Sequence, residues 1–155
     1  MRLDYASVLP ATRDALLGVE KVIVSTSLEP RLLELVKVRA SQINECASCL
    51  DIHTKDARAI GEDEQRLHLV AAWREASCFS ERERAALAWS EAVTLLSETG
   101  APDDVYDALR PVFSAEEIAA LTLAIGLINV WNRLNVGFRR PAGNYVSRRQ
   151  PPNAA

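Results

Sequence analysis

Apolar side chains recur every three or four residues along most of the chain, which is the period of an amphipathic helix. Sustained alternation with period two is missing from the sequence, and so are the Asn-Gly and Asp-Gly pairs that favour hairpins. The pattern therefore predicts an all-α fold of about six to seven helices. The predicted helices cover residues 11–27, 30 to 43, 46–60, 64–74, 80–99, a short segment that begins at 102, and 114–138.

Local start and stop signals support these boundaries. Pro10 and Pro30 stand where a first helical turn tolerates proline. The segments Ser80–Glu83 and Ser114–Glu117 both have the capping-box pattern, in which the serine and the glutamate satisfy each other's backbone amides. Gly61 follows the third predicted helix, where a residue free to adopt positive φ is useful.

The last predicted helix is apolar nearly all round, because from Ile118 to Trp131 only Thr122, Gly126 and Asn129 interrupt it. Such a helix must be covered on all sides. With Arg133, the three interruptions form a stripe of small and polar residues on one face. The stripe predicts a central core helix with close packing at Gly126, or a helix that borders a subunit interface or a pocket. The apolar stretch is shorter than the roughly 20 residues of a membrane span.

The chain has 155 residues, which indicates one domain. We expect residues 1–140 to form this single helical domain and residues 141–155, rich in proline, glycine and asparagine, to form an extended tail. Four arginines lie near this end, and they suggest either a solvated tail or an arm that reaches a second subunit: Arg139, Arg140, Arg148 and Arg149.

Composition argues against several classes of protein. The net charge is −3, whereas a nucleic-acid-binding domain usually carries a basic excess. Three cysteines are too few, and odd in number, for a secreted disulfide framework. Charged residues interrupt every apolar run in residues 1–25, so no signal peptide is predicted. We expect a soluble cytoplasmic protein without nucleic-acid or membrane partners.

Candidate chemistry is concentrated at Cys46, Cys49 and His53, which lie three and four residues apart and so share one helical face. A thiol in the first helical turn lies near free backbone amides, which favour the thiolate. The histidine can accept the thiol proton, and the second cysteine can close a disulfide after oxidation. Glu34, on the preceding predicted helix, could orient His53 or relay protons.

Other interpretations of these residues remain. Buried cysteines are often only apolar filling. A zinc site would need a fourth ligand, for which Glu34 is the candidate. A thioredoxin-type motif expects alternating strands and helices, which the pattern lacks. We expect structural roles for five further residues. Cys78 is predicted to be a free thiol and His68 a packed or partly exposed histidine. The tryptophans are expected in the core, at an interface or in a pocket wall: Trp73, Trp89 and Trp131.

The run Leu33–Asn44, followed by Cys46, Cys49 and His53, resembles the carboxymuconolactone decarboxylase-like superfamily, within it the alkylhydroperoxidase D-like (AhpD-like) branch. The shared pattern is a glutamate, eleven residues, and then C-x-x-C-x-x-x-H, which Glu34 begins. The similarity extends from about residue 30 to residue 140 through the segments Asp56–Arg58, Trp73–Glu75, Glu81–Trp89 and Asn129–Leu134.

The resemblance implies an AhpD-like helical protomer that assembles into trimers or hexamers. It also implies an antioxidant peroxidase cycle without a cofactor or metal. Cys49 would attack a hydroperoxide, Cys46 would resolve the sulfenic acid, and His53 and Glu34 would form the proton relay. A dithiol reductant, such as a thioredoxin-like or lipoamide-like partner, would restore the thiols by exchange. The alternatives are a redox-sensing or interaction protein and a carboxymuconolactone decarboxylase-like enzyme without peroxidase activity.

The chain departs from its relatives at two positions. Glu45 stands where they commonly carry glycine, and its negative charge opposes a thiolate at Cys46. Ser48 stands where they often carry an aromatic residue or histidine, so we expect an altered pocket wall and one proton carrier fewer.

Overall fold

The computed structural model describes residues 1–149, and the regular secondary structure of this part is entirely helical. It contains nine α-helices and one short 3-10 turn, η1 (Val70–Ala72). The α-helices are α1 (Tyr5–Val8), α2 (Pro10–Val24), α3 (Pro30–Ile43), α4 (Ala47–Ala59), α5 (Glu64–Leu69), α6 (Glu81–Thr94), α7 (Leu96–Thr99), α8 (Asp103–Asp107) and α9 (Ala115–Gly137). The all-α prediction is confirmed.

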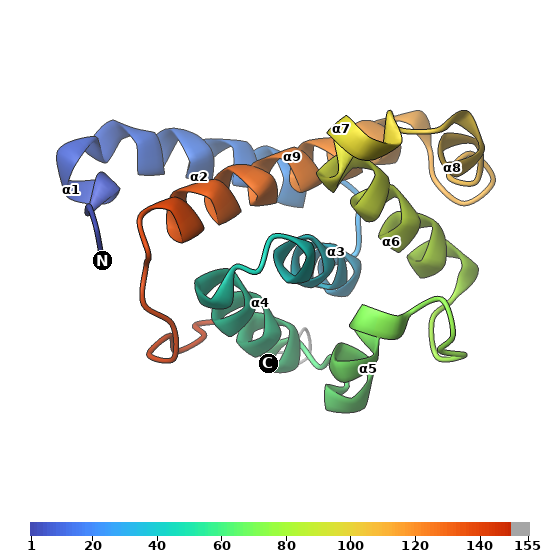
Figure 1. Ribbon diagram of the computed structural model, residues 1–155. Coiled ribbons are helices and arrows are strands. Elements are labelled where there is room, and N and C mark those ends of the chain that lie inside the picture. Colours follow the sequence, from blue (N-terminus) through green and yellow to red (C-terminus); the bar gives the residue numbers. More distant parts are fainter. Residues whose placement is uncertain (150–155) are drawn as a thin grey trace.

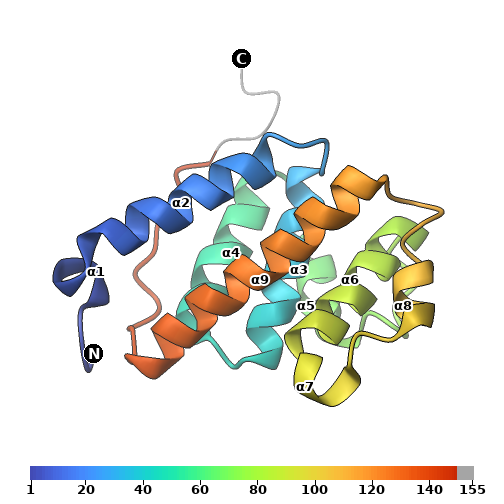
Figure 2. The ribbon, with the colours of Figure 1, turned by 90° about the horizontal axis from the view of Figure 1, so that it is seen from above.

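Helix α3 lies at the centre of the molecule and packs against α4, α6 and α9. Helices α2 and α9 run side by side as an upper layer, with α3 and α4 beneath them (Figures 1 and 2). The main core lies between α3, α6 and α9 and includes Val36, Leu121 and Ile125, all fully buried. Each such side chain contributes about 1.5–3 kcal/mol on burial.

The predicted capping signals form as expected. The side chains of Ser80 and Ser114 accept from the backbone amides three residues ahead, and Glu83 and Glu117 return the bond, so both capping boxes are complete. Pro10 and Pro30 occupy first turns. These signals depend only on neighbouring residues, which explains why the sequence places the ends of these helices well.

The structure has more helices than the six to seven predicted from the sequence, for two reasons. The short helix α1 was not predicted, although Asp4 caps it through a bond to the amide of Ala6. The segment predicted as one helix over residues 80–99 divides at Leu95, whose ψ of 36° leaves the helical region. Gly100 then ends α7 with a left-handed φ of 66°.

Helix α9 contributes to the core, but it is not covered on all sides within the described residues, and the expected close packing at Gly126 is wrong. Nothing lies within 4 Å of the position that a Cβ would take at Gly126. Leu123 and Val130 on the same face are also exposed. The other predicted role of this helix is found instead, because Ile128 and Trp131 line a cavity.

Within residues 1–149, no helix is both long enough and apolar enough to cross a bilayer. Residues 141–149 run from the end of α9 back along α4 as extended chain (Figure 1). Residues 150–155 of the predicted tail lie outside the described part.

Candidate active site

The chain reaches the two cysteines through a tight turn between α3 and α4. Glu45 adopts a left-handed φ of 52°, and the Cys46 amide donates to the Ser41 carbonyl at 2.9 Å. This hydrogen-bond pattern is common where a helix ends, and glycine is the usual residue at the left-handed position. Glu45 therefore stands in a conformation that favours glycine, since a non-glycine residue costs about 1–2 kcal/mol there.

The turn places Cys46 at the N-cap of α4, where its Sγ accepts from the Cys49 amide at 3.3 Å. Cys46 and Cys49 are joined by a disulfide and are both buried. The sulfur atoms therefore lie at the positive end of the α4 dipole, which favours a thiolate once the bond is reduced.

Asn135 of α9 also contacts the disulfide, a residue not predicted from the sequence. Its side-chain amide is buried and donates to the Sγ of Cys49 at 3.3 Å. Its carbonyl oxygen accepts from the Tyr5 hydroxyl at 3.4 Å. The available signal was the recurrence of asparagine at 129, 132 and 135 in an otherwise apolar helix.

Glu34 and His53 are in direct contact, with Glu34 Oε2 lying 2.8 Å from His53 Nδ1. The other oxygen, Oε1, lies 3.4 Å from the Lys37 ammonium and 3.2 Å from the Arg149 guanidinium. Burial by itself raises the pKa of Glu34, but Lys37, His53 and Arg149 outweigh it and lower the pKa to about 2. An ionised carboxylate can only accept, so Nδ1 carries the hydrogen, and whenever the ring is neutral Nε2 is the nitrogen that can accept a proton.

The segment after α9 completes this ion-pair arrangement. Arg149 lies 3.4 Å from Asp56 as well as close to Glu34, and the hydroxyls of Tyr145 and Ser147 donate to Asp56 at 2.9 and 2.6 Å. Burial and Asp56 together raise the pKa of Tyr145 to about 12. The prediction of a solvated tail is therefore wrong for Arg149, because a buried carboxylate attracts a cation from a distant segment.

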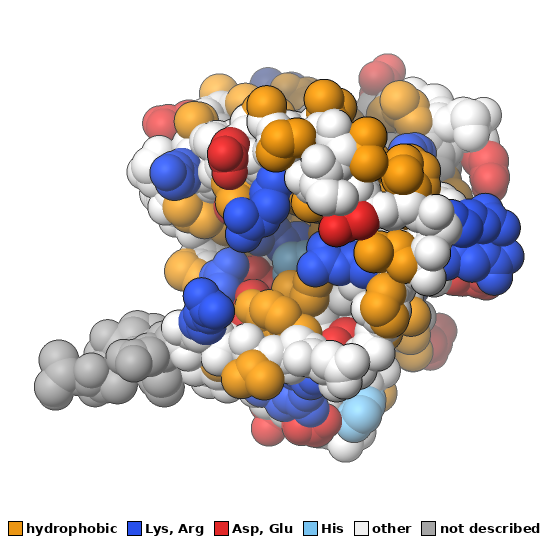
Figure 3. Space-filling model, turned by 90° about the vertical axis from the view of Figure 1, so that its left-hand side faces the viewer, with side chains coloured by type: hydrophobic (Ala, Val, Ile, Leu, Met, Phe, Trp, Pro, Cys, Tyr) orange, Lys and Arg blue, Asp and Glu red, His pale blue; other side chains and the backbone are white. Residues whose placement is uncertain are grey.

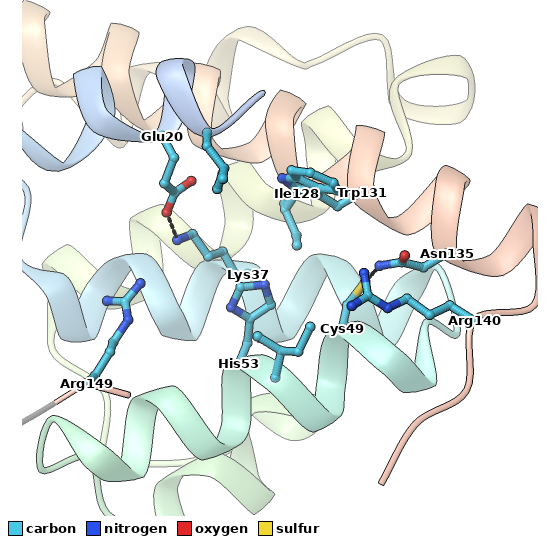
Figure 4. Close-up of a pocket in the computed structure, with 11 residues that line it drawn as sticks. Glu20, Lys37, Cys49, His53, Ile128, Trp131, Asn135, Arg140 and Arg149 are labelled. Atoms are coloured by element: carbon cyan, nitrogen blue, oxygen red, sulfur yellow. Dashed lines mark hydrogen bonds and ion pairs between the residues drawn. The ribbon is translucent and has the colours of Figure 1, made fainter. Parts of the chain in front are cut away.

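A cavity of about 240 Å³ opens beside these groups. Figure 4 shows Cys49 and His53 facing it from α4, with Trp131 and Asn135 above them on α9. Its wall is formed by apolar, polar and charged side chains: Leu17, Glu20, Lys37, Cys49, Ile52, His53, Ile128, Trp131, Asn135, Arg140 and Arg149. Cys46 is not part of this wall, so Cys49 is the sulfur accessible to a ligand in the cavity.

The zinc interpretation fits this arrangement poorly. Zinc binds thiolates, whereas both sulfur atoms are engaged in a disulfide. Donor atoms of Glu34, His53 and Asp56 lie within 4.8 Å of one another. However, Lys37 and Arg149 already neutralise these carboxylates, and a metal ion would have to displace them.

Of Ser48 and the five residues with expected structural roles, only Trp131 is part of the wall of this cavity. Ser48 is buried and is not part of this wall; it lines a neighbouring pocket together with Cys46 and Arg140 instead. Trp73 and Trp89 belong to the core, which leaves Trp131 as the tryptophan in the wall. Cys78 is a free, exposed thiol, and His68 is exposed.

This fold and site define an AhpD-like helical protein with a C-x-x-C disulfide beside a glutamate–histidine pair. Residues 10–92 match the carboxymuconolactone decarboxylase family, and the chain belongs to that family. The protein YdfG of Bacillus subtilis (strain 168), which is uncharacterized, is 37% identical over 143 residues, covering 92% of this chain and 97% of YdfG.

Solved structures give the same fold. A protein of unknown function from Agrobacterium tumefaciens, with a suggested identity as the antioxidant defence protein AhpD, is 46% identical. It superposes with a TM-score of 0.89 over 93% of this chain and 99% of that protein. An alkylhydroperoxidase AhpD core from Ralstonia eutropha JMP134, an uncharacterized peroxidase-related protein, is 19% identical with a TM-score of 0.78, covering 90% of this chain and 74% of that one. This second likeness concerns the fold alone.

Proposed function

We propose that the protein is a thiol-dependent peroxidase that reduces hydroperoxides through Cys46 and Cys49. One observation carries the proposal: Cys49 and His53 line the same cavity, and the buried, ionised Glu34 orients His53. Cys46 is bonded to Cys49 but lies outside the cavity wall. The accessible sulfur is thus suited to attack, and the other to resolve the oxidised product.

The cycle begins with the reduced pair. His53 Nε2 accepts the proton of Cys49, and the thiolate attacks the O–O bond of the hydroperoxide. The sulfur gains an oxygen and becomes a sulfenic acid, while the leaving alkoxide takes a proton from His53 and departs as an alcohol. The Cys46 thiol then displaces water from the sulfenic acid and forms the disulfide. An external dithiol reduces it by exchange and becomes a disulfide itself.

Glu34 and Asn135 act through other groups and are positioning residues. Glu34 keeps the hydrogen on His53 Nδ1 and stabilises the imidazolium that forms when Nε2 accepts a proton. The Asn135 amide donates to Cys49 Sγ, and a hydrogen bond to the charged form of a group favours that form. Both contacts support a thiolate at Cys49.

The family resemblance supports two further parts of the proposal, the reductant and the oligomeric state. The reductant is a dithiol of the thioredoxin or lipoamide type, and the assembly is a trimer or hexamer. The exposed apolar side chains of Leu123 and Val130 on α9 are suited to such a contact between copies.

Consumption of an organic hydroperoxide in the presence of dithiothreitol tests the proposal directly. We expect Cys49→Ser to reduce this turnover to the background rate, because a hydroxyl is a far weaker nucleophile than a thiolate. Cys78→Ser is the matched control, since Cys78 is a free, exposed thiol outside the cavity, and it should retain full turnover. Unchanged turnover in Cys49→Ser, or none in the native protein, would contradict the proposal.

A further inference from the structure

The cavity next to Cys49 has an apolar wall on most sides. Leu17, Ile52, Ile128 and Trp131 contribute side chains from three helices. At about 240 Å³, the cavity is smaller than the roughly 300–1,000 Å³ typical of sites for drug-sized ligands. A ligand that fills it therefore has a compact apolar body, such as a substituted ring or a short branched chain.

The charged groups of the wall differ in whether they have a partner. Lys37 is paired with Glu20, and Arg149 with Glu34 and Asp56. Arg140, by contrast, has no carboxylate within 4 Å among residues 1–149. Its side chain has one contact of hydrogen-bond type in this part of the chain, 3.5 Å from the Tyr5 hydroxyl.

The end of α9 places the backbone of Arg140 beside Asn135, the residue that contacts Cys49. Arg139 adopts a left-handed φ of 53°, and the Arg140 amide donates to the Asn135 carbonyl at 2.9 Å. The same Asn135 donates its side-chain amide to Cys49. The guanidinium thus belongs to the cavity wall that holds the reacting sulfur (Figure 4), and Figure 3 shows lysine and arginine side chains around a hollow on this face.

We propose that the substrate is an organic hydroperoxide that carries a carboxylate on a compact apolar body, and that Arg140 binds this carboxylate. The inference rests on the peroxidase function proposed above. A guanidinium binds a carboxylate with two parallel hydrogen bonds, and the apolar wall contacts the remainder of the molecule. Arg140 is a specificity-determining residue, and the carboxylate itself is unchanged in the reaction.

Cumene hydroperoxide and its para-carboxylate form a matched pair of substrates for the test. We expect the native protein to have a lower KM for the carboxylate, and Arg140→Gln to raise that KM about tenfold, the size expected for a hydrogen bond between charged groups. The KM for the neutral peroxide should change much less, so that the ratio of this KM to the KM for the carboxylate falls. Arg139→Gln, next in the chain but outside the cavity wall, should change neither value. Equal effects of Arg140→Gln on both substrates, or no preference in the native protein, would overturn the proposal.

A binding measurement separates this inference from the peroxidase function. Calorimetry on the disulfide form should show that 4-isopropylbenzoate binds more tightly than 4-isopropylbenzamide, and that Arg140→Gln removes the difference. If this preference is present but the native protein turns over neither peroxide, the peroxidase function fails and the anion site remains. If both peroxides turn over and the two ligands bind equally, the anion site fails and the peroxidase function remains.

Discussion

Two side-chain clusters that differ in charge lie along helix α4. At its start lies a sulfur cluster formed by Cys46, Cys49 and Asn135, which carries no formal charge as a disulfide. One to two turns further lies an ion-pair cluster, in which every charged group contacts a group of opposite sign or a hydrogen-bond donor: Glu34, Lys37, His53, Asp56 and Arg149.

The difference follows from the cost of burial. An ionised group removed from water is stable only when partners replace the lost hydration, and Glu34 has such partners from three segments of the chain: the cations Lys37 and Arg149, and the His53 ring. A disulfide has no charge to compensate, and one amide contact to each sulfur is enough. Substitutions in the ion-pair cluster should therefore change both stability and rate, whereas those in the sulfur cluster should mainly change rate.

The largest effect after the loss of Cys49 is expected at His53, where the two clusters meet. His53→Ala should slow peroxide reduction by about 10²–10⁴-fold, the usual contribution of a general base. The loss should grow as the pH falls, because the thiolate then arises only from unassisted ionisation. Stopped-flow measurement of disulfide formation across pH gives both the size of the rate loss and its dependence on pH. His68→Ala, at an exposed position, is the control, and a His53→Ala rate equal to that of the native protein would remove the proposed relay.

Glu34→Gln should lower the free energy of unfolding by about 3 kcal/mol, the lower end of the cost of breaking a buried ion pair. The lower end applies because Lys37 keeps Glu20 and Arg149 keeps Asp56. Urea denaturation under reducing conditions measures this, with Cys49→Ser as the comparison from the sulfur cluster. A larger loss of stability in Cys49→Ser than in Glu34→Gln would reverse the contrast between the two clusters.

Acid should reveal the same difference between native protein and Glu34→Gln. The pKa of Glu34 is lowered from 4.5 to about 2 in the folded protein. A carboxyl with a lowered folded pKa stabilises the fold fully above its unfolded value and loses this contribution as the pH falls towards the folded value. The stability gap between the two proteins should thus be constant above pH 4.5 and shrink between pH 4.5 and 2. Chemical denaturation over this range measures it; a constant gap would show that Glu34 is not the group responsible.

The smallest effect is expected at Asn135. Asn135→Ala should raise the pKa of the Cys49 thiol, because the thiolate loses the amide hydrogen bond that stabilises it. The pH dependence of alkylation by iodoacetamide reports this pKa. Asn135→Asp should raise it further, because a negative charge would replace the amide donor. An unchanged alkylation profile in both variants would show that the contact seen in the disulfide form is lost on reduction.

Local signals in the sequence were enough for much of the architecture. The capping boxes at Ser80 and Ser114 and the glycine at position 100 mark helix ends where the structure has them. Cys46, Cys49 and His53 share one face because their spacing within a single helix is set by its 3.6-residue period. Glu34 lies on another helix, so helical spacing does not place it; it was a candidate from its position on the preceding predicted helix, and the family pattern supported it.

Contacts between distant segments were decided by the tertiary structure. Asn135 reaches Cys49 across 86 positions, and Arg149 meets Glu34 from beyond the last helix. The open surface at Gly126 likewise depends on which neighbours pack against α9. Capping, turns and helical spacing are interactions over a few residues, and the sequence by itself determined them. Burial involves the whole chain, because each buried charge or amide needs a partner that can come from any segment. Only the packed structure therefore determined which residues meet at the site.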